Sequence, residues 1–220
     1  AVASKVAAVQ RYGGNIVWVE SNNRIPTSEE YDATALAIQE ETGANLVHPY
    51  DDLRTIAGQA TCAFELLEEV PDIDYLLAPV GGGGLLSGTC STAAALATGT
   101  KVVGCEPEKA DDAWRSFQEG TIVPQTDPQT IADGLRTSLG EYTFPIIAAN
   151  VSEIVTVSED AILRSMRLVW ETMKIVIEPS AAVPVAALLE KKISGHADRI
   201  GVILSGGNVD LDSLPDWPEL

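Results

Sequence analysis

The sequence predicts an α/β protein with a doubly wound parallel sheet. Stretches with helical spacing alternate with apolar runs, and runs that are apolar throughout are typical of a parallel sheet covered on both faces. Five short runs rich in Val, Ile and Leu are predicted as strands: Asn15–Val19, Tyr75–Pro79, Val102–Glu106, Glu153–Val157 and Ile200–Leu204. The predicted helices lie around Ser28–Thr42, Asp52–Leu67, Leu85–Leu96, Ala110–Gln118, Ser158–Met173 and Ala181–Lys192.

Composition limits the classes of function. The chain has 220 residues, 45% of them hydrophobic, and its 14 Lys and Arg against 32 Asp and Glu give a formal charge of −18. Such acidity argues against binding to nucleic acid or to an anionic membrane, because both need clustered basic residues. No apolar run approaches the roughly 20 residues of a membrane-spanning helix. Three scattered cysteines, Cys62, Cys90 and Cys105, predict free thiols and a cytoplasmic location.

The clearest motif is the glycine-rich turn after the strand Tyr75–Pro79. It reads VGGGGLLSG over residues 80–88 and precedes a helix, so bare backbone N–H groups and a helix N-terminus together predict a phosphate cradle. A P-loop would need Lys at Thr89, and a dinucleotide-binding loop would need Gly or Ala at Ser87. The alternative is a tight turn that uses glycine only for its conformational freedom.

Two further turns follow predicted strands. Ser205 begins the turn SGGN, where its hydroxyl could meet a neutral pyridine nitrogen, whereas a carboxylate would force that nitrogen to be protonated. The alternative is that Ser205 caps a helix. The turn CEPEKADD, residues 105–112, carries four carboxylates that could bind a hard divalent cation. There the alternative is that Asp111 and Asp112 complement a helix N-terminus.

These turns belong to a series of words spread in order over the whole chain: YGGNIV, VHPYDD, IAGQAT, PVGGGGLLSG, CEPEKADD, TIADGL, LVWETMKIVIEPS and LSGGNVDL. The series resembles the fold-type II pyridoxal-phosphate enzymes, in particular the serine racemase and threonine dehydratase group and most of all its eukaryotic-type serine racemases. The match begins well inside the family pattern and corresponds to its C-terminal two-thirds.

The resemblance implies a tryptophan-synthase-β-like fold, with residues 1–49 as the remainder of a small domain and residues 50–220 as a large pyridoxal 5'-phosphate-binding domain. It also implies a cation, Mg²⁺ or alternatively Ca²⁺ or Mn²⁺, held by Glu106, the carbonyl of Ala110, and Asp112. Ser205 would face the pyridine nitrogen. The residues implied at the cofactor are Gly81, Gly82, Gly83, Gly84, Leu85, Gly134, Glu178 and Ser205.

The activity implied by the resemblance is an ammonia-lyase or dehydratase reaction on a small β-hydroxy amino acid. Serine, threonine or threo-3-hydroxyaspartate would lose its Cα proton and then water, which yields a 2-oxo acid and ammonia; reprotonation on the opposite face would give racemisation. The enzyme would be a homodimer. Two departures from the family pattern affect the balance between elimination and racemisation: Tyr50, where mammalian-type racemases have Asn, and Ala182, where Gly is common.

The lysine that such enzymes use to form a Schiff base has no candidate in this sequence. Enzymes of the family carry it in a Ser-Phe-Lys type word, and none of the six lysines lies in that context. The chain also opens inside a predicted helix, so we expect a preceding segment or a companion chain to supply the lysine. The alternative is a catalytically silent cofactor-binding fragment, or one half of a nicked or split enzyme. The words CEPEKADD and LVWETMK argue against another branch such as the cysteine synthases.

Overall fold

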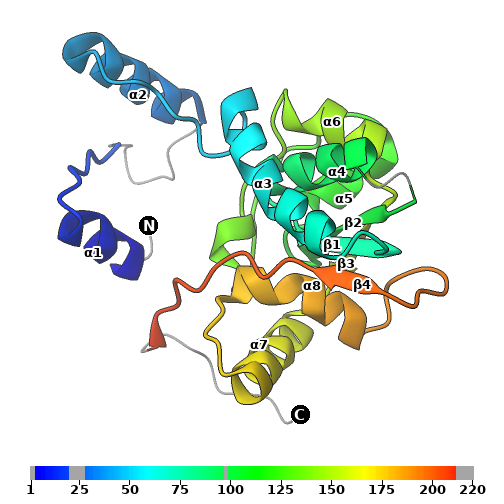
Figure 1. The fold of residues 1–220 in the computed structure, drawn as a ribbon. Coiled ribbons are helices and arrows are strands. Elements are labelled where there is room, and N and C mark those ends of the chain that lie inside the picture. Colours follow the sequence, from blue (N-terminus) through cyan, green and yellow to red (C-terminus); the bar gives the residue numbers. More distant parts are fainter. Residues whose placement is uncertain (1–2, 20–27, 97–98, 212–220) are drawn as a thin grey trace. The chain divides into compact units, whose positions relative to one another are not determined.

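The computed structural model describes residues 3–19, 28–96 and 99–211, which form two compact units (Figure 1). The first unit comprises residues 1–48 and the second comprises residues 49–220. Their assignment to a small domain and a large cofactor-binding domain stays a prediction. The sequence also predicts a short polar tail at Asp210–Leu220, and most of it lies outside the described residues.

The described residues of the first unit, 3–19 and 28–48, form the helices α1 (Ala3–Arg11) and α2 (Ser28–Thr42). The strand predicted at Asn15–Val19 is wrong, because these residues form no ladder with any described strand. A β-strand depends on a neighbour for its backbone hydrogen bonds. The apolar side chains of this segment are instead largely accessible, with Val17 58% and Trp18 62% exposed.

The second unit is built on a four-stranded parallel sheet with the order β3-β2-β1-β4. Four predicted strands are confirmed, and Leu77 at the centre pairs with Val103 on one side and Val202 on the other. The strands are β1 (Tyr75–Pro79), β2 (Lys101–Pro107), β3 (Glu153–Val157) and β4 (Ile200–Val202). The fold is therefore the predicted parallel α/β architecture.

Helices cover both faces of this sheet (Figure 1). Because successive strand residues point to opposite faces, Leu76 of β1 joins a core with α3, α4 and α6, whereas Leu77 joins a core with α7 and α8. The helices are α3 (Leu53–Glu69), α4 (Gly84–Leu96), α5 (Asp112–Glu119), α6 (Thr143–Asn150), α7 (Glu159–Met173) and α8 (Pro179–Leu189), with a 3₁₀ turn, η1 (Asp133–Leu135). Within the described ranges, no helix is long and apolar enough to span a membrane.

Local chemistry explains where several helices begin and end. The Asp52 carboxylate accepts a hydrogen bond from the Arg54 N–H at the start of α3, and the Ser158 hydroxyl accepts one from the Ala161 N–H at the start of α7. Gly120 ends α5 in the left-handed conformation, with φ of 71°. Helix α6 and the turn η1 were not predicted. The sequence of α6, TFPIIAAN, is too short and too evenly apolar to show a helical period.

Core packing on α4 gives a stability prediction. Leu86 is fully buried, whereas Leu96 on the same helix is 52% exposed. Replacing Leu86 by Ala should lower the free energy of unfolding by about 2–5 kcal/mol through lost burial and a residual cavity. Leu96→Ala makes the same chemical change, yet it should cost less than about 1 kcal/mol. Urea unfolding of both variants measures the difference, and equal losses would contradict the assigned core.

Candidate active site

A pocket of about 400 Å³ opens where the strand order reverses. The chain leaves β1 toward β2 and β3 and later returns to β4 on the other side of β1. Parallel α/β sheets bind ligands at such a switch point, beyond the carboxyl ends of the strands. All eight residues predicted at the cofactor line this pocket: Gly81, Gly82, Gly83, Gly84, Leu85, Gly134, Glu178 and Ser205.

The glycine turn forms the wall of the pocket after β1. Gly81, Gly82, Gly83 and Gly84 are all buried, and α4 begins at Gly84. Gly83 has a φ of +90°, and a Cβ there would lie 2.8 Å from Ile147 Cδ1. Because first-turn N–H groups have no partner inside their own helix, the start of α4 offers donors to an anion. Close packing and a positive φ thus both require glycine at residue 83.

The segment after β4 brings Ser205 to the same pocket. Residues 203–210 form no helix, so the alternative that Ser205 caps one is wrong. The Glu178 N–H donates to the Gly206 carbonyl at 3.0 Å, and a Cβ on Gly207 would lie 2.5 Å from the Val176 carbonyl oxygen. These contacts hold the segment against the residues that precede α8, and Ser205 and Glu178 both line the pocket.

The opposite wall comes from η1 and the start of α8. The Gly134 N–H donates to the Ser180 hydroxyl oxygen at 3.1 Å, which fixes η1 beside α8. Asp133 also lines the pocket. Our prediction from sequence did not select three further lining residues, Gln59, Thr137 and Ser180. Gln59 and Ser180 lie inside the family words IAGQAT and LVWETMKIVIEPS, so the resemblance to the family was the signal that could have identified them as pocket residues.

Tyr50 packs directly on the glycine turn. A Cβ on Gly82 would lie 2.3 Å from Tyr50 Cγ, and a Cβ on Gly84 would lie 3.0 Å from Tyr50 Cα. Glycine at residues 82 and 84 therefore makes room for the residues that lead into α3. Tyr50 itself lines the pocket.

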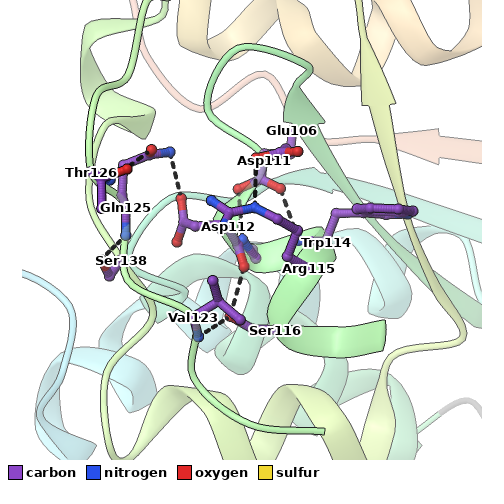
Figure 2. A network of polar contacts seen from close by, with 11 residues as sticks. Glu106, Asp111, Asp112, Trp114, Arg115, Ser116, Val123, Gln125, Thr126 and Ser138 are labelled. Atoms are coloured by element: carbon purple, nitrogen blue, oxygen red, sulfur yellow. Dashed lines mark hydrogen bonds and ion pairs between the residues drawn. The ribbon is translucent and has the colours of Figure 1, made fainter. Parts of the chain in front are cut away.

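The acidic turn after β2 contains two buried carboxylates (Figure 2). The Glu106 carboxylate accepts hydrogen bonds from the N–H groups of Ala113 (3.0 Å) and Trp114 (2.9 Å), so it caps α5. Asp112 Oδ1 accepts from the Gln125 side-chain amide at 2.9 Å. Asp112 Oδ2 is buried and has no hydrogen-bond partner within the described part of the chain.

Burial disfavours the ionised form of both carboxylates. Burial, together with the nearby charge of Asp112, raises the pKa of Glu106 well above its ordinary value. Burial also raises the pKa of Asp112 to about 7. Asp111 and Asp112 do lie at the start of α5, but the Asp111 side chain makes no cap hydrogen bond and contacts Arg115 at 2.8 Å. A divalent cation fits this donor set, since it would offset both charges and use the orphaned Asp112 oxygen.

The described residues contain no group of three or more His, Cys, Asp or Glu side chains placed to hold a metal. The predicted set of Glu106, Asp112 and the carbonyl of Ala110 has only two such side chains, so this finding does not test it. Ala110 is buried in the same turn.

With this geometry established, the comparisons with known proteins identify the family. Residues 1–206 match the family described as pyridoxal-phosphate dependent enzyme, and the chain belongs to it. The chain is 47% identical to a β-hydroxyaspartate dehydratase of Paracoccus denitrificans, over 96% of this chain and 66% of that protein. It is also 47% identical to the L-threo-3-hydroxyaspartate ammonia-lyase of Saccharomyces cerevisiae, over 96% of this chain and 64% of that protein.

Among solved structures, that of maize serine racemase superposes with a TM-score of 0.90 at 41% identity, over 97% of this chain and 65% of that one. The predicted resemblance is thus confirmed. The chain spans slightly less than two thirds of the length of these relatives.

The glycine turn yields a prediction that needs no ligand. Gly83→Ala forces a side chain into a positive φ and into contact with α6, so it should lower the free energy of unfolding by at least about 2 kcal/mol. Gly58 on α3 has open space around it, and Gly58→Ala should raise stability by about 0.5–1 kcal/mol. Thermal or urea unfolding measures both changes. A harmless Gly83→Ala would contradict the close approach of α6.

Proposed function

We propose that the protein carrying this chain is a pyridoxal-phosphate dependent dehydratase, or ammonia-lyase, of a small β-hydroxy amino acid. It would remove the Cα proton and the β-hydroxyl and so release a 2-oxo acid and ammonia. The observation that carries this proposal is the switch-point pocket, which brings together the glycine turn and Ser205, two parts of the second unit that lie far apart in the sequence.

The glycine turn and the start of α4 would hold the phosphate of the cofactor. The turn is buried, and its backbone N–H groups together with a helix N-terminus suit a dianion. Gly81, Gly82, Gly83, Gly84 and Leu85 are the residues we assign to this task. The bound cofactor would supply the electron sink that acidifies the Cα–H of an amino acid.

Ser205 would set the electronic character of the ring. A hydroxyl can hydrogen-bond a neutral pyridine nitrogen without forcing a proton onto it. The ring then withdraws electrons moderately, which suits elimination because the departing β-hydroxyl relieves the charge at Cα. Glu178 and Gly134 would flank the ring from the other walls of the pocket.

The lysine of the reaction has no candidate in the pocket. None of the described residues that line it is a lysine. The proposed reaction would therefore take its Schiff-base lysine from another segment of the protein or from a companion chain. The relatives, which are longer than this chain, leave room for such a part.

The substrate we favour is threo-3-hydroxyaspartate. Two relatives named for hydroxyaspartate share 47% identity with this chain, compared with 41–44% for those named serine racemase. Serine and threonine are the other candidates. The serine racemase relatives also favour a second outcome at the same site, namely return of the proton to the opposite face of Cα.

We further propose that the acidic turn binds Mg²⁺, or Ca²⁺ or Mn²⁺ in its place. Glu106, Asp112 and the carbonyl of Ala110 would provide oxygen ligands, with water completing the shell. The orphaned oxygen of Asp112 and the raised pKa of Glu106 support this assignment.

A homodimer and a cytoplasmic location also belong to the proposal. Three free cysteines favour a reducing compartment.

Activity assays on the intact protein test the function. We expect 2-oxo acid release from threo-3-hydroxyaspartate, serine or threonine, with chiral chromatography to detect racemised substrate. Ser205→Ala should lower kcat by about tenfold or more and change cofactor affinity little. The hydroxyl would affect the electronic character of the pyridine ring, whereas the glycine turn would bind the phosphate. No product from any of the three substrates would contradict the reaction class, and an unchanged kcat would contradict the role of Ser205.

The cation proposal has its own test. Asp112→Asn removes one charged ligand, so the affinity for Mn²⁺ should fall by about tenfold or more. Electron paramagnetic resonance of free and bound Mn²⁺ measures this affinity. Asp111→Asn makes the same charge change one residue away and should weaken binding by less than about threefold, because Asp111 pairs with Arg115. Equal effects of the two variants, or no saturable Mn²⁺ binding by the unaltered protein, would remove this site.

A further inference from the structure

Helix α6 lies directly behind the glycine turn. Gly83 packs on Thr143, Leu139 and Ile147, which belong to α6 or to the residues that lead into it. Ile147 and Thr143 are fully buried. The Ser87 hydroxyl on α4 adds a hydrogen bond to the Thr143 carbonyl at 3.3 Å. The position of the turn therefore depends on the position of the N-terminus of α6.

The Asp51 carboxylate holds the N-terminus of α6. Asp51 Oδ1 accepts hydrogen bonds from the N–H groups of Tyr142 (2.9 Å) and Thr143 (3.1 Å), and Asp51 Oδ2 accepts from Glu141 N–H (3.0 Å). Three charge-assisted bonds and a helix dipole make this a strong anchor. Gly140 allows the approach, since a Cβ there would lie 2.1 Å from Asp51 Cγ.

Thr143 connects the N-terminus of α6 to the glycine turn. Its hydroxyl donates to the Gly82 carbonyl at 2.8 Å in a buried contact, and its oxygen accepts from the Gly140 N–H at 2.8 Å. The described backbone has no cis peptide bond. In a trans peptide the C=O and the following N–H point in opposite directions. A Gly82 carbonyl held toward Thr143 therefore points the Gly83 N–H away from α6.

We propose that Asp51 and Thr143 are positioning residues for the phosphate cradle: Asp51 fixes the start of α6, and the Thr143 hydroxyl orients the peptide between Gly82 and Gly83. This rests on the proposed function, in which the glycine turn holds the cofactor phosphate. Neither Asp51 nor Thr143 is among the residues that line the pocket. Their effect is that the turn presents its N–H groups in a fixed arrangement before the ligand arrives, so less ordering is required on binding.

The arrangement also explains how a carboxylate is tolerated near a site for a dianion. Asp51 directs both oxygens at backbone N–H groups of residues 141–143, so its charge is stabilised by the dipole of α6. The N-terminus of α6 is thereby occupied from within the chain, and α4 is left to attract the phosphate.

The test compares two ligands on the intact protein. The ratio measured is the dissociation constant of pyridoxal divided by that of pyridoxal 5'-phosphate. Pyridoxal lacks the phosphate and also closes to an internal hemiacetal; because the second difference is the same for every variant, a change in the ratio between variants isolates the cradle. Thr143→Val removes the hydroxyl and keeps the shape of the side chain, and it should reduce this ratio by about fivefold or more, the value of one buried hydrogen bond. Thr143→Ser restores the hydroxyl and should retain the ratio within about twofold. Phosphorus NMR of the bound cofactor should show a shifted phosphate signal for Thr143→Val but not for Thr143→Ser.

A second pair of variants covers the case in which Thr143→Val does not fold. Asp51→Asn keeps one acceptor but loses the charge and the bond to Glu141, so it should lower the ratio by about threefold or more. Asp52→Asn is the matched control. Asp52 caps α3 and pairs with Arg54, and its variant should leave the ratio unchanged even where stability falls.

The outcomes separate the two proposals. If the unaltered protein does not prefer pyridoxal phosphate to pyridoxal, the phosphate cradle itself is wrong. If it does, and folded Thr143→Val or Asp51→Asn keeps the original ratio and phosphorus signal, the cradle stands and the positioning role is overturned. Loss of discrimination in both Thr143→Val and Asp51→Asn, with rescue by Thr143→Ser, supports the proposal.

Discussion

The close approach of other segments to the backbone of the glycine turn is the constraint on which the second unit depends. Tyr50 lies where a Cβ of Gly82 would be, and α6 and the residues leading into it lie where a Cβ of Gly83 would be. The backbone of Leu135 approaches Gly81 in the same way. Tyr50 and the stretch 135–147, which lie far apart in the sequence, thus meet on one turn. The same bare backbone is available to an anion. Packing and ligand binding require the same residues.

The acidic turn and the pocket share a loop. Gln125, whose side chain holds Asp112, donates its own N–H to the Ser138 hydroxyl at 2.8 Å (Figure 2). Between these two residues the Gln129 N–H donates to the Lys109 carbonyl, and Gly134 and Thr137 line the pocket. The acidic turn and the lining of the pocket are thus joined by one hydrogen-bonded segment, residues 125–138.

Much of this arrangement could be predicted from the sequence, because it depends on local patterns. Buried strands are continuous apolar runs, so β1, β2 and β3 were placed within one residue at each end. The parallel topology then brought residues 81–85 and Ser205 to one edge of the sheet. The order of the family words placed Gly134 and Glu178 in the same pocket.

The remainder depends on partners that a sequence does not name. Asn15–Val19 has the composition of a strand, but a strand also requires a neighbour. Glu106 resembled a ligand on the chain, yet its carboxylate also caps a helix seven residues away. The contact of Asp51 with residues about 90 positions further on has no local signature, because any loop carboxylate could make it.

The central claim is that the switch-point pocket binds the phosphate of the cofactor through the glycine turn. A crystal structure of the intact protein grown with pyridoxal 5'-phosphate tests it most directly. We expect phosphate density within hydrogen-bonding distance of the backbone N–H groups of residues 81–85, with the ring nitrogen facing the Ser205 hydroxyl. Phosphate density elsewhere on the protein, with an empty glycine turn, would contradict it.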